Sequence, residues 1–270
     1  MTTSEPAPGT PVLFVHGLWL HATSWQPWLD LFRGEGYAPA APGWPGFPDT
    51  VEEARAHPEA LAGVGVQEVT DHYAGIVRGL ATKPIVIGHS FGGLVAQKLL
   101  GQGDAAAAVA IDAAAVKGVL ALPLSTLRTA FPALRNPFSV KGTVALDEDQ
   151  FRYRFGNAVG QDESRELHRQ WHIPAPGRPL WQGAAANFNP KSPLRVDTGN
   201  AARGPLLLTA GGEDHVIPPV ITRSTYKRYR HSPAVTDIHE FAGKGHSLAL
   251  DSGWREVADR VLGWLHGHGL

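Results

Sequence analysis

Residues 83–101, KPIVIGHSFGGLVAQKLLG, decide the fold of this chain. The stretch begins with Ile-Val-Ile at 85–87, a β-branched run that predicts a buried strand. Gly-His-Ser-Phe-Gly at 88–92 then fits the pattern G-x-S-x-G, and the apolar residues after it recur at helical spacing. So short a pattern arises by chance in many chains, but here it has the strand, turn and helix that give it meaning. Ser90 is therefore a candidate nucleophile, and the amide of Phe91 lies at the predicted helix N-terminus, where negative charge is favoured.

Strands and helices alternate on both sides of this stretch. Strands are predicted at 12–15, 37–41, 106–111, 205–210 and 235–241, and helices near 25–32, 66–80, 218–230 and 254–265. The alanine run within 106–111 leaves a helix open as an alternative there. Such alternation predicts an α/β fold with a doubly wound, mostly parallel sheet, in which ligands bind beyond the carboxyl ends of the strands.

The alternation lapses between residues 117 and 202, a stretch rich in proline and aromatic residues. Asp147 and Asp162 indicate helix starts within it, which predicts short amphipathic helices. We expect this stretch to form an inserted, mainly helical cap over the carboxyl edge of the sheet; the alternative is an ordinary run of peripheral helices. The predicted regions are a disordered leader at 1–10, a core at 11–116 and 203–270, and the cap at 117–202.

A serine nucleophile needs a base and a group that orients the base, and both are expected in loops after later strands. Asp214 follows the strand at 205–210, and His246 follows the strand at 235–241. The order Ser90, Asp214, His246 is the order expected when the serine of a G-x-S-x-G turn is the nucleophile. These three residues are the predicted catalytic set.

Each assignment has rivals nearby in the sequence. Glu213 and Asp112 are alternative acids, but the two glycines before Glu213 allow the loop of Asp214 to turn inward. His215 lies one residue from the acid, and His239 lies within a strand, so His246 is the preferred base.

The residues after the first strand, His-Gly-Leu-Trp at 16–19, predict an oxyanion-binding loop. The amide of Leu18, paired with that of Phe91, would bind the oxyanion, and the amide of Trp19 is the alternative donor. Trp19 and Trp44 are candidate walls of an apolar acyl pocket, although such aromatics also fill cores. No third ligand accompanies the histidines of this loop, so no metal site is expected.

Together these motifs resemble the α/β-hydrolase superfamily over nearly the whole chain. GHSFGG, the His-Gly pair after the first strand, GGEDHVIP and GKGHS look like that family's nucleophile elbow, oxyanion loop, acid loop and histidine loop. The resemblance implies an eight-stranded core, but this chain starts at about the family's third strand and so lacks the N-terminal hairpin. In this it is similar to compact serine esterases and the cofactor-free haloperoxidase-like branch. Dehalogenases and epoxide hydrolases of the family place aspartate where Ser90 stands, which disfavours both.

The composition limits the partners that we expect. The 270 residues can bury a substantial core, and the net charge of −1 without long runs of either sign does not indicate binding to nucleic acid or to a membrane. The absence of cysteine excludes disulfides and thiol chemistry. The N-terminus lacks the features of a signal peptide, and no apolar run reaches about 18 residues, so the expected location is cytoplasmic. The oligomeric state is left open.

The expected function is a cofactor-free serine hydrolase that cleaves a small-molecule carboxylic ester or lactone through an acyl-enzyme on Ser90. A lyase or a C–C bond hydrolase could use the same residues as acid and base. Outside enzymes, the alternative is a small-molecule receptor with little turnover.

Overall fold

A six-stranded parallel sheet runs through the computed structural model, which describes residues 9–270. Its strands are, in spatial order, β2 (Ala38–Ala40), β1 (Pro11–Val15), β3 (Ile85–His89), β4 (Ala107–Ile111), β7 (Leu206–Gly211) and β8 (Thr236–Phe241). Every neighbouring pair is parallel, and Val86 lies in register between Leu13 and Ala108. The doubly wound sheet is therefore confirmed, and β4 is a strand rather than the alternative helix.

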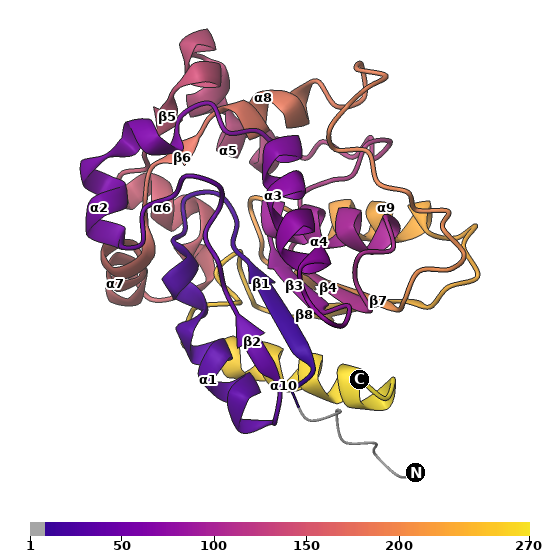
Figure 1. Cartoon of the computed structure of the whole chain (residues 1–270). Helices are drawn as coiled ribbons and strands as arrows, with labels where there is room; N and C mark the ends of the chain where they lie inside the picture. The colour runs from indigo at the N-terminus through magenta and orange to yellow at the C-terminus, as the bar shows by residue number, and fades with distance from the viewer. Residues whose placement is uncertain (1–8) are drawn as a thin grey trace.

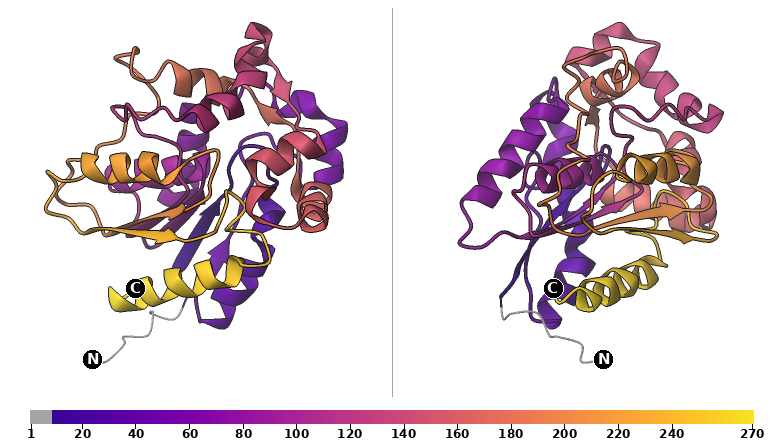
Figure 2. Two further views of the ribbon diagram at one scale, coloured as in Figure 1. Left: turned by 180° about the vertical axis from the view of Figure 1, so that it is seen from behind. Right: turned by 90° about the vertical axis from the view of Figure 1, so that its right-hand side faces the viewer.

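Side chains that alternate along the strands divide the core into two halves. Val12 and Phe14 face one side of the sheet, where they pack with Trp28 of α1 and with α10. Leu13 and Val15 face the other side and pack with α3 and α4. The helices around the sheet are α1 (Gln26–Gly34), α3 (Val66–Arg78), α4 (Phe91–Gly101), α9 (Pro219–Arg228) and α10 (Trp254–Gly267). The short α2 (Val51–Ala56) packs instead with Ile173, in the segment between β4 and β7. Figures 1 and 2 show α1 and α10 together on one side, opposite α3 and α4.

Aromatic rings fill the half of the core under α1. Phe14 lies between the rings of Trp25, Trp28 and Phe32, at centroid distances of 5.0, 5.9 and 5.2 Å. Trp28 Nε1 also donates a 2.7 Å hydrogen bond to the carbonyl of Ala249, which ties this helix to the loop that carries His246.

The segment between β4 and β7 lies at the top and on the left of Figure 1, with α5 and α8 beyond the carboxyl ends of the strands. It contains α5 (Leu124–Leu134), α6 (Glu148–Arg154), α7 (Gln161–Trp171), α8 (Arg178–Ala184) and an antiparallel pair, β5 (Thr143–Val144) and β6 (Ala175–Pro176). Asp147 caps α6 and accepts a hydrogen bond from Gln150 N, and Asp162 lies in the first turn of α7, so both predicted helix starts are present. The boundaries of a separate cap stay a prediction.

Four short 3-10 helices complete the described chain, at Ala22–Trp25, Pro58–Leu61, Pro137–Lys141 and Gly156–Ala158. The predicted leader at 1–10 falls outside the described residues except for its last two positions, where Gly9 N donates to the carbonyl of Gly36. Between residues 9 and 270, no helix combines the length and the apolar character needed to cross a membrane.

Two glycines of the G-x-S-x-G turn allow backbone segments to touch. A Cβ atom at Gly88 would lie 2.1 Å from the carbonyl oxygen of Gly92. A Cβ atom at Gly92 would lie 2.0 Å from the carbonyl oxygen of Val15, at the end of β1. Because backbone atoms cannot move aside as a flexible side chain can, both positions require glycine for this packing.

We predict that Gly92→Ala lowers the free energy of unfolding by about 3 kcal/mol, because the new methyl group overlaps the end of β1. Gly75→Ala is the matched control, since Gly75 lies on the exposed side of α3 and a Cβ atom added there would have no neighbour within 4 Å. This control should raise stability by about 0.5–1 kcal/mol. Urea unfolding of both variants provides the measurement, and equal stabilities would contradict the packing argument.

Candidate active site

Ser90 occupies the sharp turn between β3 and α4 with φ 57° and ψ −121°. A non-glycine residue rarely adopts a positive φ, so the surroundings must hold this conformation. Ser90 N donates to the carbonyl of Ile111 at 2.9 Å, and Ser90 O accepts hydrogen bonds from the amides of Gly93 and Ala114 at 3.0 Å. The turn is thus fixed to β4 as well as to its own helix.

The three predicted catalytic side chains meet at the carboxyl edge of the sheet. His246 Nε2 lies 3.0 Å from Ser90 Oγ, and His246 Nδ1 lies 2.6 Å from Asp214 Oδ2. The other oxygen of Asp214 accepts the amides of Val216 and Ile217 at 2.6 and 3.0 Å. This arrangement directs the Nδ1 proton of His246 to the carboxylate, so Nε2 is free to accept the proton of the serine hydroxyl.

The rival acids and bases lie elsewhere or are more distant. The carboxyl oxygen of Asp112 lies 3.8 Å from His246 Nδ1, against 2.6 Å for Asp214. Glu213 is exposed, His215 Nδ1 lies 2.9 Å from the carbonyl of Tyr153, and His239 lies within β8. Geometry therefore brings Asp214 rather than these residues to His246.

Two buried carboxyl groups lie side by side at this site and have opposite protonation preferences. Burial would raise the pKa of Asp214, but the charge and hydrogen bond of His246 hold that pKa below its ordinary value. Burial, followed by the negative charge of Asp214, raises the pKa of Asp112 well above its ordinary value. Asp112 Oδ1 accepts a hydrogen bond from the amide of Gly211 at 2.7 Å, whereas Asp112 Oδ2 is buried and has no hydrogen-bond partner among residues 9–270. A buried carboxylate oxygen without a donor is costly, which favours the protonated form of Asp112.

The loop after β1 packs directly against Ser90. A Cβ atom at Gly17 would lie 2.7 Å from Ser90 Cβ and 3.4 Å from Ser90 Oγ, so only glycine allows this approach. The next residue is Leu18, and Trp19 after it has a positive φ of 65°. Within residues 9–270, neither the amide of Leu18 nor that of Phe91 donates a hydrogen bond to another protein atom. These are the two amides predicted to bind the oxyanion.

The two tryptophans predicted as pocket walls are both buried. Trp19 Nε1 donates to the carbonyl of Val144 at 2.9 Å, which joins the loop after β1 to β5. Trp44 Nε1 donates to the carbonyl of His16 at 3.1 Å, and its ring stacks on the His16 imidazole. Both indoles therefore hold this loop in place, and their contact with a substrate stays a prediction.

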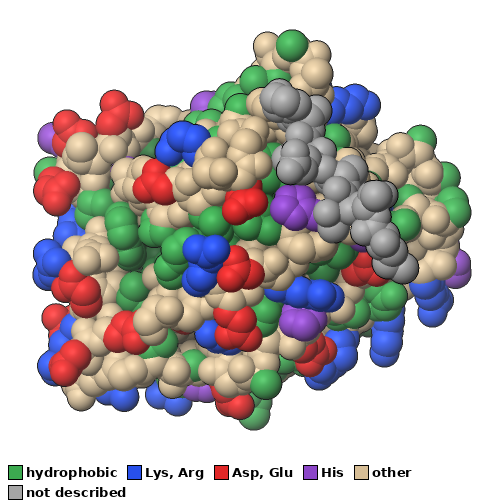
Figure 3. All heavy atoms as spheres, turned by 90° about the horizontal axis from the view of Figure 1, so that it is seen from below, with side chains coloured by type: hydrophobic (Ala, Val, Ile, Leu, Met, Phe, Trp, Pro, Cys, Tyr) green, Lys and Arg blue, Asp and Glu red, His purple; other side chains and the backbone are tan. Residues whose placement is uncertain are grey.

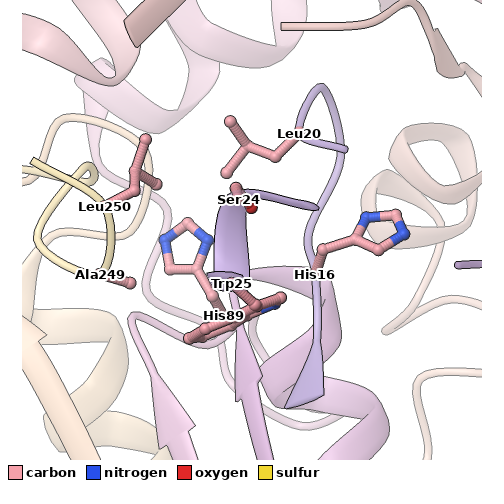
Figure 4. Close-up of a pocket in the computed structure, with 7 residues that line it drawn as sticks. All are labelled: His16, Leu20, Ser24, Trp25, His89, Ala249 and Leu250. Carbon is pink, nitrogen blue, oxygen red and sulfur yellow. The ribbon is translucent and has the colours of Figure 1, made fainter. Parts of the chain in front are cut away.

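His89, directly before the serine, is a site residue that sequence analysis did not assign. Its Nε2 donates to the carbonyl of His246 at 2.9 Å, and the two imidazole rings lie 4.6 Å apart. Burial lowers the pKa of His89 to about 3, so it is neutral at pH 7. Figure 4 shows His89 beside Leu20, Ser24 and a small buried hollow, with the imidazole of His16 turned away. The only signal in the sequence was its place in the G-x-S-x-G pattern.

One group of side chains in the described part of the chain has the composition of a metal site. Ligand atoms of His89, Asp112 and His246 lie within 4.8 Å of one another. Both nitrogens of His246 are already engaged, one by Asp214 and one by Ser90. The group could bind a metal ion only if it broke one of these hydrogen bonds, so it does not fit a resident metal.

We predict that Asp112→Asn becomes progressively more stable than the wild type as the pH rises. A carboxyl group with a raised pKa keeps its proton in the folded state, whereas the unfolded chain loses it above a pH of about 3.9. Between this pH and the raised pKa of Asp112, the free energy of unfolding of the wild type therefore falls as the pH rises, by at most about 1.4 kcal/mol per pH unit. The amide of Asn at position 112 does not titrate, so the variant avoids this loss. Urea unfolding at pH 4 and at pH 7 provides the measurement. A stability difference that does not change with pH would show that Asp112 is ionised.

The comparisons with known proteins agree with this architecture. A family model described as "Alpha/beta hydrolase family" matches residues 12–260. A monoacylglycerol lipase from Paleococcus ferrophilus superposes with a TM-score of 0.69 at 22% identity, covering 96% of each chain. A thermophilic esterase from Thermogutta terrifontis superposes with a TM-score of 0.66 at 20% sequence identity. The match covers 98% of this chain and 92% of the esterase. An extracellular α/β-hydrolase from a Paenibacillus species superposes with a TM-score of 0.67 at 19% sequence identity. The match covers 94% of this chain and 98% of the Paenibacillus protein. No curated protein sequence matches the chain.

Proposed function

Because this chain belongs to the alpha/beta hydrolase family, we propose that it is a serine hydrolase that cleaves a carboxylic ester or lactone through an acyl-enzyme on Ser90. The observation that carries the proposal is the bridge formed by His246, 3.0 Å from the serine hydroxyl and 2.6 Å from Asp214. Such a bridge lets one imidazole move a proton while a buried carboxylate stabilises the resulting charge.

Acylation begins with attack of Ser90 Oγ on the carbonyl carbon of the ester, while His246 Nε2 takes the hydroxyl proton. The carbonyl oxygen becomes an oxyanion and is stabilised by the amides of Leu18 and Phe91. When the tetrahedral intermediate collapses, the bond to the alcohol oxygen breaks, and His246 returns the proton to that oxygen. Asp214 stays ionised and stabilises the imidazolium throughout.

Deacylation repeats the same steps with water. His246 Nε2 takes a proton from water, the resulting hydroxide attacks the acyl carbonyl, and the carboxylic acid leaves as Ser90 Oγ regains the proton. With a lactone, the leaving alcohol and the acyl group belong to one molecule, so the ring opens and a hydroxy acid is released. No cofactor takes part in either half.

Apolar side chains around the serine favour an apolar acyl group. Phe91 packs against a buried apolar cluster. The cluster includes Leu94 of α4, Val119 from the segment after β4, and Val216 and Ile217, which follow Asp214. The ring of Phe155 lies 5.1 Å from that of His246 on the other side. Two of the structural neighbours are named as a lipase and an esterase, which supports ester substrates by analogy of fold.

We predict that Ser90→Ala abolishes both labelling by a fluorophosphonate probe and hydrolysis of short nitrophenyl esters, because the nucleophile is lost. Ser252→Ala, at an exposed serine outside the site, should retain both. Mass spectrometry of the labelled peptide and initial rates provide the measurements. Labelling at Ser90 with negligible ester turnover would contradict a hydrolase and favour a receptor or a lyase.

Asp214→Asn should lower kcat by about 10⁴-fold and leave the fold intact, because the amide favours the wrong tautomer of His246. Initial rates and thermal unfolding of the variant test this. If turnover survives, Asp112, whose carboxyl oxygen lies 3.8 Å from His246 Nδ1, orients the histidine instead.

We also predict that Gly17→Ala lowers kcat/KM by at least about tenfold, because the methyl group displaces the loop that carries one oxyanion donor. Gly34→Ala is the matched control, because Gly34 lies at the exposed end of α1 and a Cβ atom added there would have no neighbour within 4 Å. Thermal unfolding should show that both variants remain folded at the assay temperature. Full activity in Gly17→Ala would rule out the proposed oxyanion loop.

A further inference from the structure

The surface of α5 and its flanking segments exposes an unusual number of large apolar side chains. Six of them lie between residues 120 and 138 and a seventh follows α8; they are Leu120 (80% exposed), Leu122 (64%), Leu124 (83%), Leu127 (42%), Phe131 (61%), Phe138 (84%) and Phe188 (89%). Single exposed leucines are ordinary, but a group of this size is typical of an interaction surface. We call these seven residues, with the cations described below, the α5 surface.

The exposed residues of α5 share one face of the helix. Leu124, Leu127 and Phe131 recur at intervals of three and four residues, whereas Thr129 and Ala133 on the opposite side are buried. Thr126 Oγ1 also donates to the carbonyl of Val216 at 2.9 Å, which fixes the inner side of the helix to the body of the protein. The helix is therefore already packed through its inner face, and its apolar outer face has no partner within residues 9–270.

The segment that carries six of these side chains is positively charged. Residues 113–146 contain no aspartate or glutamate, and their four cations are Lys117, Arg128, Arg135 and Lys141. None of the four forms an ion pair with a carboxylate of the described residues. The near-neutral charge of the whole chain conceals this local excess.

Phe188 extends the surface across a neighbouring loop. The side chain of Asn187 accepts the amide of Gly118 at 2.7 Å and donates to the carbonyl of Val119 at 2.8 Å. Lys117 Nζ donates to the carbonyl of Asn189. These bonds hold the loop of Phe188 against the segment that leads to α5.

The opposite end of the molecule has a different character. Figure 3 looks at that end, below α1 and α10 in the view of Figure 1, and shows lysines and arginines interspersed with acidic side chains. Ion pairs there include Arg33 with Asp30 on α1 and Arg255 with Asp259 on α10. Mixed charge of this kind is typical of a surface that stays in water.

We propose that the α5 surface docks on a lipid surface that carries anionic headgroups. Leucine and phenylalanine side chains insert at the boundary between headgroups and acyl chains, and lysine and arginine bind the anionic phosphates. Residues 113–146 carry four cations and no acidic side chain, so their charge is complementary to that of anionic headgroups. This complementarity favours anionic lipids over a neutral surface. This proposal goes beyond ester hydrolysis and departs from the expectation, drawn from composition, that no membrane is a partner.

The surface also adjoins the candidate active site. Ala114, whose amide binds the carbonyl of Ser90, precedes Leu120 by only six residues, so the two lie within about 22 Å even if the chain is fully extended. Val119 packs in the same cluster as Phe91. Docking through the α5 surface would therefore bring the site close to the lipid.

The test measures binding of the Ser90→Ala protein to vesicles, so that it does not depend on any turnover. Vesicles of phosphatidylcholine with phosphatidylglycerol are compared with vesicles of phosphatidylcholine alone, by co-sedimentation at low and at high salt. We expect binding to the anionic vesicles that weakens with salt, because screening reduces the attraction of exposed cations. Failure to bind the anionic vesicles would overturn the proposal and leave the hydrolase untouched.

Two double variants separate the apolar from the charged contribution. Leu124→Ser with Phe131→Ser should weaken partitioning by about tenfold or more, because two large apolar groups no longer insert. Arg128→Gln with Arg135→Gln should weaken binding to anionic vesicles by about tenfold and leave any weak binding to neutral vesicles unchanged. Arg33→Gln with Arg260→Gln is the control, since it removes two positive charges from the end formed by α1 and α10.

Other outcomes of the same experiment argue against the proposal. An equal loss of binding in the control pair would show that net charge, not the α5 surface, attracts the vesicles. Sedimentation velocity supplies a second readout: a concentration-dependent dimer that Leu124→Ser with Phe131→Ser disrupts, without vesicle binding, would assign the surface to contact between two copies. Thermal unfolding of each variant shows that these exposed substitutions leave the fold intact.

Discussion

The approach of three backbone segments around Ser90 is the constraint on which the rest of the site depends. The end of β1 contacts the turn of Ser90 at Gly92. Gly88, in β3, contacts the backbone of Gly92, and Gly17, in the loop after β1, contacts Ser90 itself. Each contact lies closer than a Cβ atom would allow. Because the serine is held at φ 57° by these contacts and by the amide of Ala114, its hydroxyl has a fixed direction before any substrate arrives. Preorganisation of this kind lowers the cost of reaching the transition state.

The electrostatics of the site follow from burial. Ser90, Asp214 and His246 are all at least 95% buried, so an ionised carboxylate there needs donors to replace water. Asp214 has them in two backbone amides and the imidazole, while Asp112 has one amide and is disfavoured as an anion. The two carboxyl groups thus differ in charge although they are neighbours. His89, kept neutral by burial, fixes the carbonyl of His246 without adding charge beside it.

Much of the fold could be predicted from local patterns, because β-branched runs and helical spacing are properties of short segments. The sheet between residues 12 and 241 followed from those patterns, and the alanine-rich β4 was resolved only by its pairing with β3 and β7. The choice between Asp214 and Asp112 depends on a difference of about an ångström in space, which loop order alone does not determine. His89 was missed because its partner is 157 residues away. The short pair β5 and β6 likewise depends on contacts distant in sequence.

The asymmetry of the surface bears on how a buried site could receive its substrate. Ser90 is buried, and Val119, which packs in the same apolar cluster as Phe91, directly precedes the exposed Leu120. If the α5 surface docks on lipid as proposed, an apolar ester dissolved there would be presented to the side of the molecule that carries this cluster. The mixed charges of the opposite end disfavour contact with lipid there, so attraction of the cations near α5 would orient the molecule with the α5 surface toward the lipid. The orientation of the molecule on lipid would therefore depend on a segment that the fold of the sheet itself does not require.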